Sequence, residues 1–523
     1  MTSTDFAAVD DAPRSDQQAL LDSLYFDLTA LDFTFDAITA LLGQEAVEAF
    51  GRDQIPPALR QVRRATPKQS GLATVIGLFQ LGQGYPADRI DAAFGRTGVQ
   101  GLLRLGLIEQ HGPGLRASVA LTPHASDSSA ELWVAHDLGA HQRPGVLRAD
   151  HVLGIGQASL TLAQITLRPQ VDRALDLGTG CGIQTFHLLA HCRHVTATDL
   201  SVRALAFTRF NLLLNHRQLE VDPARLEERV SLRCGSLFEP VQGQRFDLIA
   251  TNPPFVITPR AEDEAIFTYR DGGMAGDSLI QALISQLPSY LEPGGSAQML
   301  ANWEIPLGEQ PWDQRIRPWF DPALDVWVIQ REQSSPSLYA ETWLRDASQD
   351  QDPEQYQQAY QAYLDDFAGR SVAGIGFGYV YLGLARDGHR PEQRFESITH
   401  PVQQPLAPFL QRDLHTAAEL RAANGQWGQW HLEVAEDVTE ERHRRPGAEH
   451  PGVILLRQGA GLRRSEVLDT AQAGFVSASD GELSVDQLVN ALDALIGEGD
   501  ESFADRLRDG VERLIRHGFL RKV

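Results

Sequence analysis

Cysteine is scarce in this chain, with three residues among 523. Cys181, Cys192 and Cys234 cannot all pair and show no CxxC spacing, which excludes a disulfide-stapled secreted domain and indicates a reducing compartment without structural zinc. No apolar run approaches the ~20 residues that cross a bilayer. The first residues are acidic and polar and lack the basic and apolar regions of a signal peptide. These absences predict a cytoplasmic protein with no membrane partner.

Positive charge is also low, because 46 Lys and Arg residues face 69 Asp and Glu residues and the formal net charge is −23. A protein that binds duplex nucleic acid normally carries a basic field, since affinity comes largely from neutralised phosphates. The acidity disfavours a nucleic-acid partner without excluding a local basic groove. Hydrophobic residues make up 42% and charged residues 22% of the chain, which at this length indicates about three globular domains.

Two regions with mostly helical apolar spacing flank the middle of the chain. We predict a disordered tail over 1–15, a helical module over 16–148, and a C-terminal module over 396–523. In the first module the phrase GVQGLLRLGLIEQ predicts a helix that Gly106 stops before an apolar strand, and Gly518 holds the same place near the end of the chain. This repeat favours a winged-helix-like unit at each end. Two amphipathic helical bundles that only pack on the rest of the protein are the alternative.

Strand and helix patterns alternate over 149–395, which predicts an α/β domain with a parallel sheet. The predicted strands are RALDLGTG, HVTATDLS, VSLRCGS, FDLIATNPP and GSAQMLANW. Two later strands, in VWVIQRE and GIGFGYVYLGLAR, enclose a helix in PEQYQQAYQAYLDDFAG.

A glycine-rich loop, DLGTGCG, follows the first of these strands and precedes a helix. Gly178, Gly180 and Gly182 allow a tight turn and close approach of a ligand to the backbone. Asp176 stands before the first glycine, where its carboxylate favours a cationic ligand group and would repel a pyrophosphate. Asp199 ends the second strand about 20 residues later, a position from which a carboxylate can bridge ribose hydroxyls.

The loop, the acid and their spacing resemble those of the class I S-adenosylmethionine-dependent methyltransferases. The resemblance implies a seven-stranded Rossmann-like sheet closed by an antiparallel pair, with S-adenosylmethionine as the cofactor. It also implies a set of cofactor-binding residues: Asp176, Gly178, Thr179, Gly180, Gly182, Asp199, Leu200, Ser236, Leu237 and Asn252. The family usually has an acidic residue where Ser236 stands, so Leu237 and Phe238 are expected to supply mostly apolar packing there. Since these residues lie between 150 and 255, we expect cofactor binding to need neither end module.

The phrase NPPF follows the fourth strand, at the sheet edge where ligands of open parallel sheets bind. An amide or aryl amine is a poor nucleophile because its lone pair is delocalised. The Asn252 side-chain oxygen and the Pro253 carbonyl can each accept one N–H and thereby orient the nitrogen, and Phe255 offers a flat apolar face. We predict Asn252, Pro253 and Phe255 as the catalytic residues for methyl transfer to a planar nitrogen.

The motif resembles that of methyltransferases acting on glutamine side chains, adenine or guanine. YRDGGMAGDSLIQALISQL resembles the segment after NPPY in the release-factor glutamine methyltransferases, and HVLGIGQASLTLAQIT resembles the cofactor-closing segment of the small-methyltransferase superfamily. The first prediction is therefore a glutamine amide in a protein of the translation machinery. The alternative is an exocyclic amine of an RNA or DNA base, which would have to be flipped out of a duplex. Either substrate is macromolecular, and the end modules are candidates for docking it. A binding protein that kept the cofactor fold as a scaffold is a third hypothesis, which the intact motifs disfavour.

Two further features resemble sites without the residues such sites require. His187 and His191 stand one helical turn apart, but no Glu follows the first as in H-E-x-x-H, so no metal site is predicted. Cys181 lies inside the glycine loop and is interpreted as a small apolar filler, since methyl transfer needs no covalent intermediate.

Overall fold

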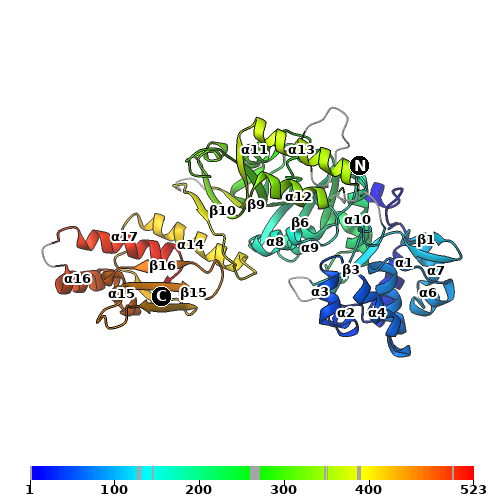
Figure 1. Ribbon diagram of the computed structural model, residues 1–523, viewed down its shortest axis with the longest axis horizontal. Helices are drawn as coiled ribbons and strands as arrows, with labels where there is room; N and C mark the ends of the chain where they lie inside the picture. Colours follow the sequence, from blue (N-terminus) through cyan, green and yellow to red (C-terminus); the bar gives the residue numbers. More distant parts are fainter. Residues whose placement is uncertain are drawn as a thin grey trace. The chain divides into compact units, whose positions relative to one another are not determined.

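The computed structural model describes residues 3–125, 131–143, 147–259, 271–346, 349, 352–385, 390–497 and 500–523. The chain divides into two compact units, one of residues 1–163, 169–386 and 391–397 and the other of residues 164–168, 387–390 and 398–523. Figure 1 colours the chain from the N-terminal helices in blue to the last helices in red. The site described below lies in the first unit.

The N-terminal part of the first unit is mainly helical. Its elements are η1 (Ser3–Phe6), α1 (Gln18–Ala30), α2 (Phe35–Leu42), α3 (Gln44–Phe50), α4 (Pro56–Arg64), η2 (Pro67–Gln69), α5 (Ser70–Val75), η3 (Ile76–Gln80), α6 (Ala87–Ala93), α7 (Gly98–Arg104), and the hairpins β1 (Ile108–His111) with β2 (Gly114–Ala117) and β3 (Ala120–Ala125) with β4 (Glu131–His136). Gly106 has φ +69° between α7 and β1, so the predicted sequence of helix, glycine and strand is present. The strand β1 leads into a hairpin with β2.

The first fifteen residues differ from the predicted disordered tail over their described part. The Phe6 side chain is fully buried, and the Ser3 amide donates to Glu227 Oε1 at 2.9 Å. Farther along, Arg209 donates to the Ser15 carbonyl at 2.6 Å. Buried apolar side chains and hydrogen-bond partners distant in sequence hold this segment, whereas its local composition is polar.

The rest of the first unit is an α/β core. Its elements are α8 (Gln157–Ile165), β5 (Val171–Leu177), α9 (Ile183–Leu189), β6 (Cys192–Asp199), α10 (Val202–Leu214), η4 (Pro223–Glu228), β7 (Val230–Cys234), η5 (Glu239–Val241), β8 (Phe246–Thr251), α11 (Ser278–Gln286), η6 (Leu287–Tyr290), β9 (Leu291–Pro306), η7 (Arg317–Trp319), β10 (Leu324–Ser334), α12 (Pro336–Asp346), α13 (Pro353–Gly369), β11 (Val372–Leu384) and β12 (Gln393–Ser397). The strands form one sheet in the order β12-β10-β11-β9-β8-β5-β6-β7. Strands β5 to β9 pair in parallel, and β11 runs antiparallel between β9 and β10.

All seven predicted strands and the closing antiparallel pair are confirmed, but the sheet has an eighth strand. The edge strand β12 pairs in parallel with β10, from Val326 opposite Gln393 to Gln330 opposite Ser397. Trp327 Nε1 donates to Glu396 Oε1 at 2.5 Å, which ties a polar side chain of β12 to the neighbouring strand. The sequence QRFES has only one apolar residue, so its pattern does not predict a strand.

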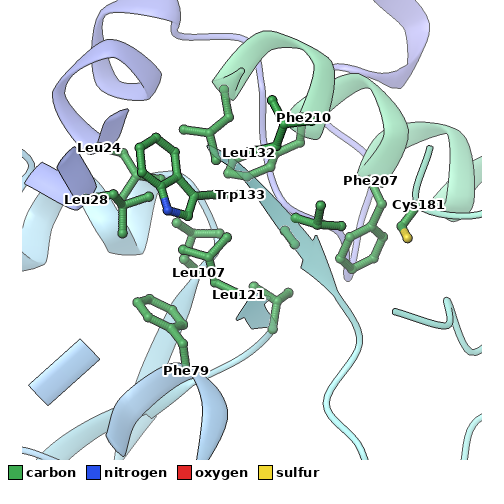
Figure 2. Close-up of a cluster of buried hydrophobic side chains, with 14 of the residues drawn as sticks. Leu24, Leu28, Phe79, Leu107, Leu121, Leu132, Trp133, Cys181, Phe207 and Phe210 are labelled. Atoms are coloured by element: carbon green, nitrogen blue, oxygen red, sulfur yellow. The ribbon is translucent and has the colours of Figure 1, made fainter. Parts of the chain in front are cut away.

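Alternate residues of the central strands face two separate cores, as the period of a strand requires. Ala174, Leu248 and Ala250 pack with the helices α9 and α10, whereas Leu175 and Ile249 pack with α11 and η6 on the other face. The first of these cores continues into the N-terminal helices without a break. Figure 2 shows the junction, where side chains of α1, η3, β3 and β4 meet those of α10.

Two asparagines, Asn211 in α10 and Asn215 directly after its end, join the N-terminal hairpin to the core. Asn211 Oδ1 accepts the Ala135 amide at 2.7 Å while its Nδ2 donates to the Ala135 carbonyl at 2.9 Å. One helical turn later, Asn215 makes the same pair of bonds with Trp133, both at 2.8 Å. Asn211 Nδ2 also donates to the Cys181 carbonyl at 2.9 Å, inside the glycine-rich loop. These side chains satisfy backbone groups of β4 as a neighbouring strand would.

The second unit has its own core and two small sheets. Its elements are α14 (Ala407–Ala423), β13 (His431–Val434), β14 (Val438–His443), β15 (Val453–Gln458), β16 (Ser465–Leu468), α15 (Thr470–Ser477), β17 (Asp480–Ser484), α16 (Val485–Ile496), α17 (Phe503–Arg516) and β18 (Leu520–Lys522). Gly518 has φ +76° and lies between α17 and β18, just as Gly106 lies between α7 and β1 with a positive φ. However, β18 pairs with the distant strand β13 and forms no hairpin of its own. Among the described helices of both units, none is long and apolar enough to span a membrane.

Candidate functional site

The glycine-rich loop connects β5 to α9 at the carboxyl edge of the sheet. Gly178 and Gly180 have φ of +80° and +59°, and a Cβ at either position would meet no atom within 4 Å. At Gly182, with φ +98°, a Cβ would lie 3.1 Å from the Phe186 ring. The open space beside Gly178 and Gly180 can receive a ligand. Gly182, by contrast, is needed for packing of the loop against α9.

Asp176 is buried beside this loop, and one of its two carboxylate oxygens accepts three hydrogen bonds. Its Oδ2 accepts the Thr179 and Thr185 hydroxyls, each at 2.7 Å, and the Thr185 amide at 2.9 Å. Its Oδ1 is buried and has no hydrogen-bond partner among the described residues. Burial raises the pKa of Asp176 to about 6, despite these hydrogen bonds, and the charge of Asp199 adds to the rise. A buried carboxylate oxygen without a partner is costly, so the site is suited to a cationic or N–H-bearing group.

Asp199 ends β6 beside the same loop. Its Oδ2 accepts the Gly180 amide at 2.9 Å, and its Oδ1 accepts the Ser201 amide at 2.8 Å. Burial raises the pKa of this carboxyl, and the backbone hydrogen bonds oppose the rise. The next residue, Leu200, is 60% exposed and presents an apolar surface next to the acid.

The loop after β7 holds the other two residues predicted near the cofactor. Ser236 is exposed, and its amide donates to Glu239 Oε2 at 3.4 Å. Leu237 has φ +48° and is half-buried against the second core. Its neighbour Phe238 stacks on Tyr290 with ring centroids 4.2 Å apart, so the expected apolar packing is present at Phe238.

The NPPF motif begins one residue after β8 ends. Leu177 lies opposite both Thr198 and Thr251, so the carboxyl ends of β5, β6 and β8 line up. Thr251 Oγ1 donates to the Leu177 carbonyl at 2.8 Å and links the motif directly to the start of the glycine loop. The sheet thus brings the predicted residues of all three strands to one edge.

The two side chains that define the motif differ in their contacts. Asn252 Oδ1 is buried and, among the described residues, has no hydrogen-bond partner. The half-buried Phe255 forms an isolated β-bridge with Asp271, and its ring meets the edge of Trp343 at a centroid distance of 6.3 Å. An acceptor oxygen without a partner and, three residues later, a half-buried aromatic ring fit a planar group that carries N–H donors.

The predicted flanking segments lie near this edge as well. In the segment from 269 to 287, Tyr269 and Arg270 lie outside the described residues, and the described part begins at Asp271. The upstream segment contains α8, which the Gln184 side chain ties to α9 by a 2.7 Å bond to the Ser159 carbonyl.

The two histidines and the cysteine that were predicted to form no functional site take part in packing. His187 Nε2 lies 3.1 Å from His124 Nε2, whereas His191 Nδ1 lies 2.8 Å from the Pro169 carbonyl, so the two histidines engage different partners. The Cys181 side chain is buried in the first core, and burial raises the pKa of its thiol to about 12. A thiol with this pKa is protonated at neutral pH and is a poor nucleophile.

Sequence reasoning missed Tyr339, which bonds the backbone two residues after the motif, and Asn302, which bonds Tyr339. Tyr339 on α12 accepts the Ile257 amide at 2.8 Å and Asn302 Nδ2 at 3.1 Å. Tyr339 is 82 residues from Ile257 in a segment with no motif, so no local signal indicates it. Asn302 offers a weak signal, as a polar residue within an otherwise apolar strand.

Comparison with known proteins gives two family matches. Residues 138–311 match the methyltransferase small domain, and residues 30–118 match a domain family of unknown function. A protein of Methanocaldococcus jannaschii named "Putative protein N5-glutamine methyltransferase" is 30% identical over 149 residues, which are 28% of this chain and 68% of that protein. The chain belongs to the small-domain methyltransferase family.

Other members have names that point to two kinds of substrate. A "Ribosomal protein uL3 glutamine methyltransferase" of Bradyrhizobium diazoefficiens is 34% identical over 160 residues, covering 29% of this chain and 46% of that protein. A "Ribosomal RNA small subunit methyltransferase C" of Alcanivorax borkumensis is 29% identical over 134 residues, covering 26% of this chain and 33% of that protein. The chain spans about half the length of the curated relatives it matches first, with shares of 46%, 44% and 47%.

Proposed function

We propose that this small-domain methyltransferase transfers a methyl group from S-adenosylmethionine to a planar nitrogen. The observation that carries the proposal is the buried Asn252 Oδ1, which lacks a partner among the described residues and lies at the sheet edge that also holds Asp176 and Asp199. Such an oxygen is suited to accept an N–H from a substrate, since binding would satisfy a polar group that folding leaves unpaired.

The residues at the ends of β5 and β6 fit the cofactor. S-adenosylmethionine supplies an electrophilic methyl group, whose transfer breaks the S–C bond and leaves the electron pair on sulfur. Asp176 would hold its ammonium group through the unpartnered Oδ1, and Asp199 would accept hydrogen bonds from the ribose hydroxyls. The exposed Leu200 would cover the adenine ring, and the open space at Gly178 and Gly180 would receive the chain of the ligand.

Replacing Asp199 by alanine should weaken cofactor binding by about 10-fold or more, the scale of a lost charged hydrogen bond. Calorimetric titration with S-adenosylmethionine measures the change. Asp172→Ala is the matched control, because Asp172 is an exposed acid on β5 whose partner, Arg193, is exposed as well. Equal affinity of wild type and Asp199→Ala would refute the cofactor site.

The acceptor nitrogen needs orientation more than it needs a base. Asn252 Oδ1 and the Pro253 carbonyl would each accept one N–H, which directs the nitrogen lone pair out of conjugation. Phe255 would support the flat face of the group. The nitrogen loses one proton to solvent after positive charge has formed on it, so no strong general base is required.

The leading substrate class is a glutamine amide in a protein of the translation machinery. The supports are the names of relatives at 30–34% identity, the segment that follows NPPF, and the net charge of −23. An exocyclic amine of an RNA base is the second candidate, favoured by the ribosomal RNA relative. A DNA base shares that chemistry, and either would require a local basic path on an acidic protein.

We further propose that the two end modules, with their helix–glycine–strand phrases, are winged-helix-like units that dock the macromolecular substrate.

Incubation of the enzyme with methyl-labelled cofactor and a cell lysate separates these substrates. We expect label that survives ribonuclease, is lost to protease, and is found on glutamine after digestion to amino acids. Label removed by ribonuclease would move the proposal to an RNA base. Label on oxygen or carbon would refute a nitrogen acceptor.

A further inference from the structure

The Tyr339 hydroxyl contacts the backbone just after the NPPF motif. We call residues 252–259 the NPPF segment. Its oxygen accepts the Ile257 amide at 2.8 Å and Asn302 Nδ2 at 3.1 Å. Packing fixes the ring, which stacks on Phe377 at 5.7 Å and meets the edge of Phe367 at 5.6 Å. The hydroxyl is therefore rigid and bridges three elements: the NPPF segment, β9 and α12.

Asn302 is the second member of this bridge. It lies on β9 beyond the end of β8, since Thr251 pairs with Met299. Its side chain is completely buried, and Oδ1 has no hydrogen-bond partner among the described residues. A leucine of similar volume would avoid the cost of this unpaired oxygen, so stability alone does not explain an amide at this position.

The NPPF segment needs anchors because its sequence provides few. Pro253 and Pro254 have no backbone N–H, and the described chain from 252 to 259 forms no helix or ladder beyond the bridge at Phe255. Thr251 fixes the start of the segment through Leu177. The bond from the Ile257 amide to Tyr339 fixes it on the far side of the motif.

We propose that Tyr339, held by Asn302, is a positioning residue for the acceptor motif. The inference rests on the proposed function: Asn252 Oδ1 and the Pro253 carbonyl orient the nitrogen only if the backbone between Thr251 and Ile257 is held in place. Displacements of ~1 Å at a reacting group can cost ~100-fold in rate. The Tyr339 hydroxyl thereby links α12 to the backbone of the acceptor motif by a hydrogen bond, in addition to the ring contact between Phe255 and Trp343.

Tyr339→Phe tests this in the full-length protein, and Tyr363→Phe is the matched control. Tyr363 lies in the same aromatic cluster, and its substitution leaves the bond between Ile257 and Tyr339 in place. In Tyr339→Phe the turnover number for methyl transfer should fall about 10-fold. The dissociation constant of S-adenosylmethionine should stay within about twofold, since Asp176 and Asp199 are not touched. Tyr363→Phe should change neither quantity.

Hydrogen exchange gives a readout that does not depend on activity. The peptide 252–259 contains three prolines, so its backbone amides are confined to Asn252, Phe255, Val256, Ile257 and Thr258. We expect the Ile257 amide to exchange at least ~10-fold faster in Tyr339→Phe, because its acceptor is gone. Asn302→Leu, which removes the donor that holds the hydroxyl, should shift exchange and turnover in the same direction by less.

The outcomes separate this inference from the proposed function. Unchanged exchange, or faster exchange with full turnover, overturns the positioning role. If the wild type transfers no methyl group to any offered acceptor, the proposed function fails and positioning fails with it, even where exchange accelerates. If Tyr339→Phe does not fold, the exchange rate of the Ile257 amide and the turnover number of Asn302→Leu test the positioning role instead.

Discussion

Replacing Asn252 by alanine should nearly abolish methyl transfer while leaving cofactor affinity almost unchanged. Asn252 stands at the end of β8, whereas Asp176 and Asp199 stand at the ends of β5 and β6. Loss of a hydrogen bond at the reacting atom typically costs ~3 kcal/mol in the transition state, or about 100-fold or more in rate. Turnover on the identified substrate and calorimetric titration with S-adenosylmethionine measure the two quantities.

The structure indicates that Asn252→Ala changes the acceptor site without changing the stability of the protein. Asn252 Oδ1 has no partner among the described residues, so its removal breaks no known intramolecular bond and should not lower the free energy of unfolding. Gln281→Ala is the control, because Gln281 is an exposed amide on α11 of the same core. Near-normal turnover of Asn252→Ala would refute the planar-nitrogen mechanism.

The aromatic position of the motif should show a graded response. Phe255→Leu keeps apolar area but loses the flat face and the edge contact with Trp343, so its loss of turnover should be smaller than that of Asn252→Ala. This order follows from the proposed roles, since orientation of the nitrogen depends on Asn252 and only support of the group depends on Phe255.

The parts of the fold that could be predicted are those whose determinants lie close together in sequence. The glycine loop, its two acids and NPPF each occupy a few consecutive residues at the end of an apolar strand, so pattern and spacing indicate them. Their roles toward cofactor and substrate stay predictions. By contrast, β12 is short and polar, and its pairing depends on β10 some 67 residues earlier.

Contacts between distant segments could not be predicted from local pattern. Phe6 is buried by residues far along the chain, so a segment with a polar composition is ordered. Tyr339 reaches Ile257 through the tertiary arrangement of α12. The pair Asn211 and Asn215 did leave a signal, as two amides one turn apart within the apolar phrase FNLLLN, but their partners on β4 could not be identified.

These asparagines change one expectation about the end modules. All predicted cofactor residues lie between 150 and 255, which suggests that the N-terminal module is dispensable for binding. However, the described residues between 3 and 143 share one continuous core with α10, and every residue of α10 from Arg203 to Leu214 is buried. Figure 2 shows Phe210 of α10 beside Leu132 of the hairpin.

Deletion of residues 1–147 should therefore prevent the methyltransferase core from folding. The deletion removes the partners of Asn211 and Asn215 on β4 and exposes the apolar side chains that β4 and α1 cover. It also leaves Arg203 without Asp137, which binds both of its terminal nitrogens at 2.7 and 3.0 Å. Buried polar groups stripped of partners cost ~1–3 kcal/mol each, and a domain is stable by only ~5–15 kcal/mol in total.

The truncated chain should accumulate in the insoluble fraction, or, if soluble, show no cooperative unfolding and no binding of S-adenosylmethionine in calorimetry. Residues 1–147 supplied as a separate chain should restore part of the soluble core, because the interface is complementary without the peptide link.

A point variant tests the same interface in the intact protein: Asn211→Ala should lower the unfolding midpoint and weaken cofactor affinity, since Asn211 also holds the Cys181 carbonyl of the glycine loop. Asn490→Ala, an exposed asparagine in α16, should change neither. A chain of residues 148–523 that folds cooperatively and binds the cofactor as tightly as the full protein would contradict this account and restore the N-terminal module to a purely docking role.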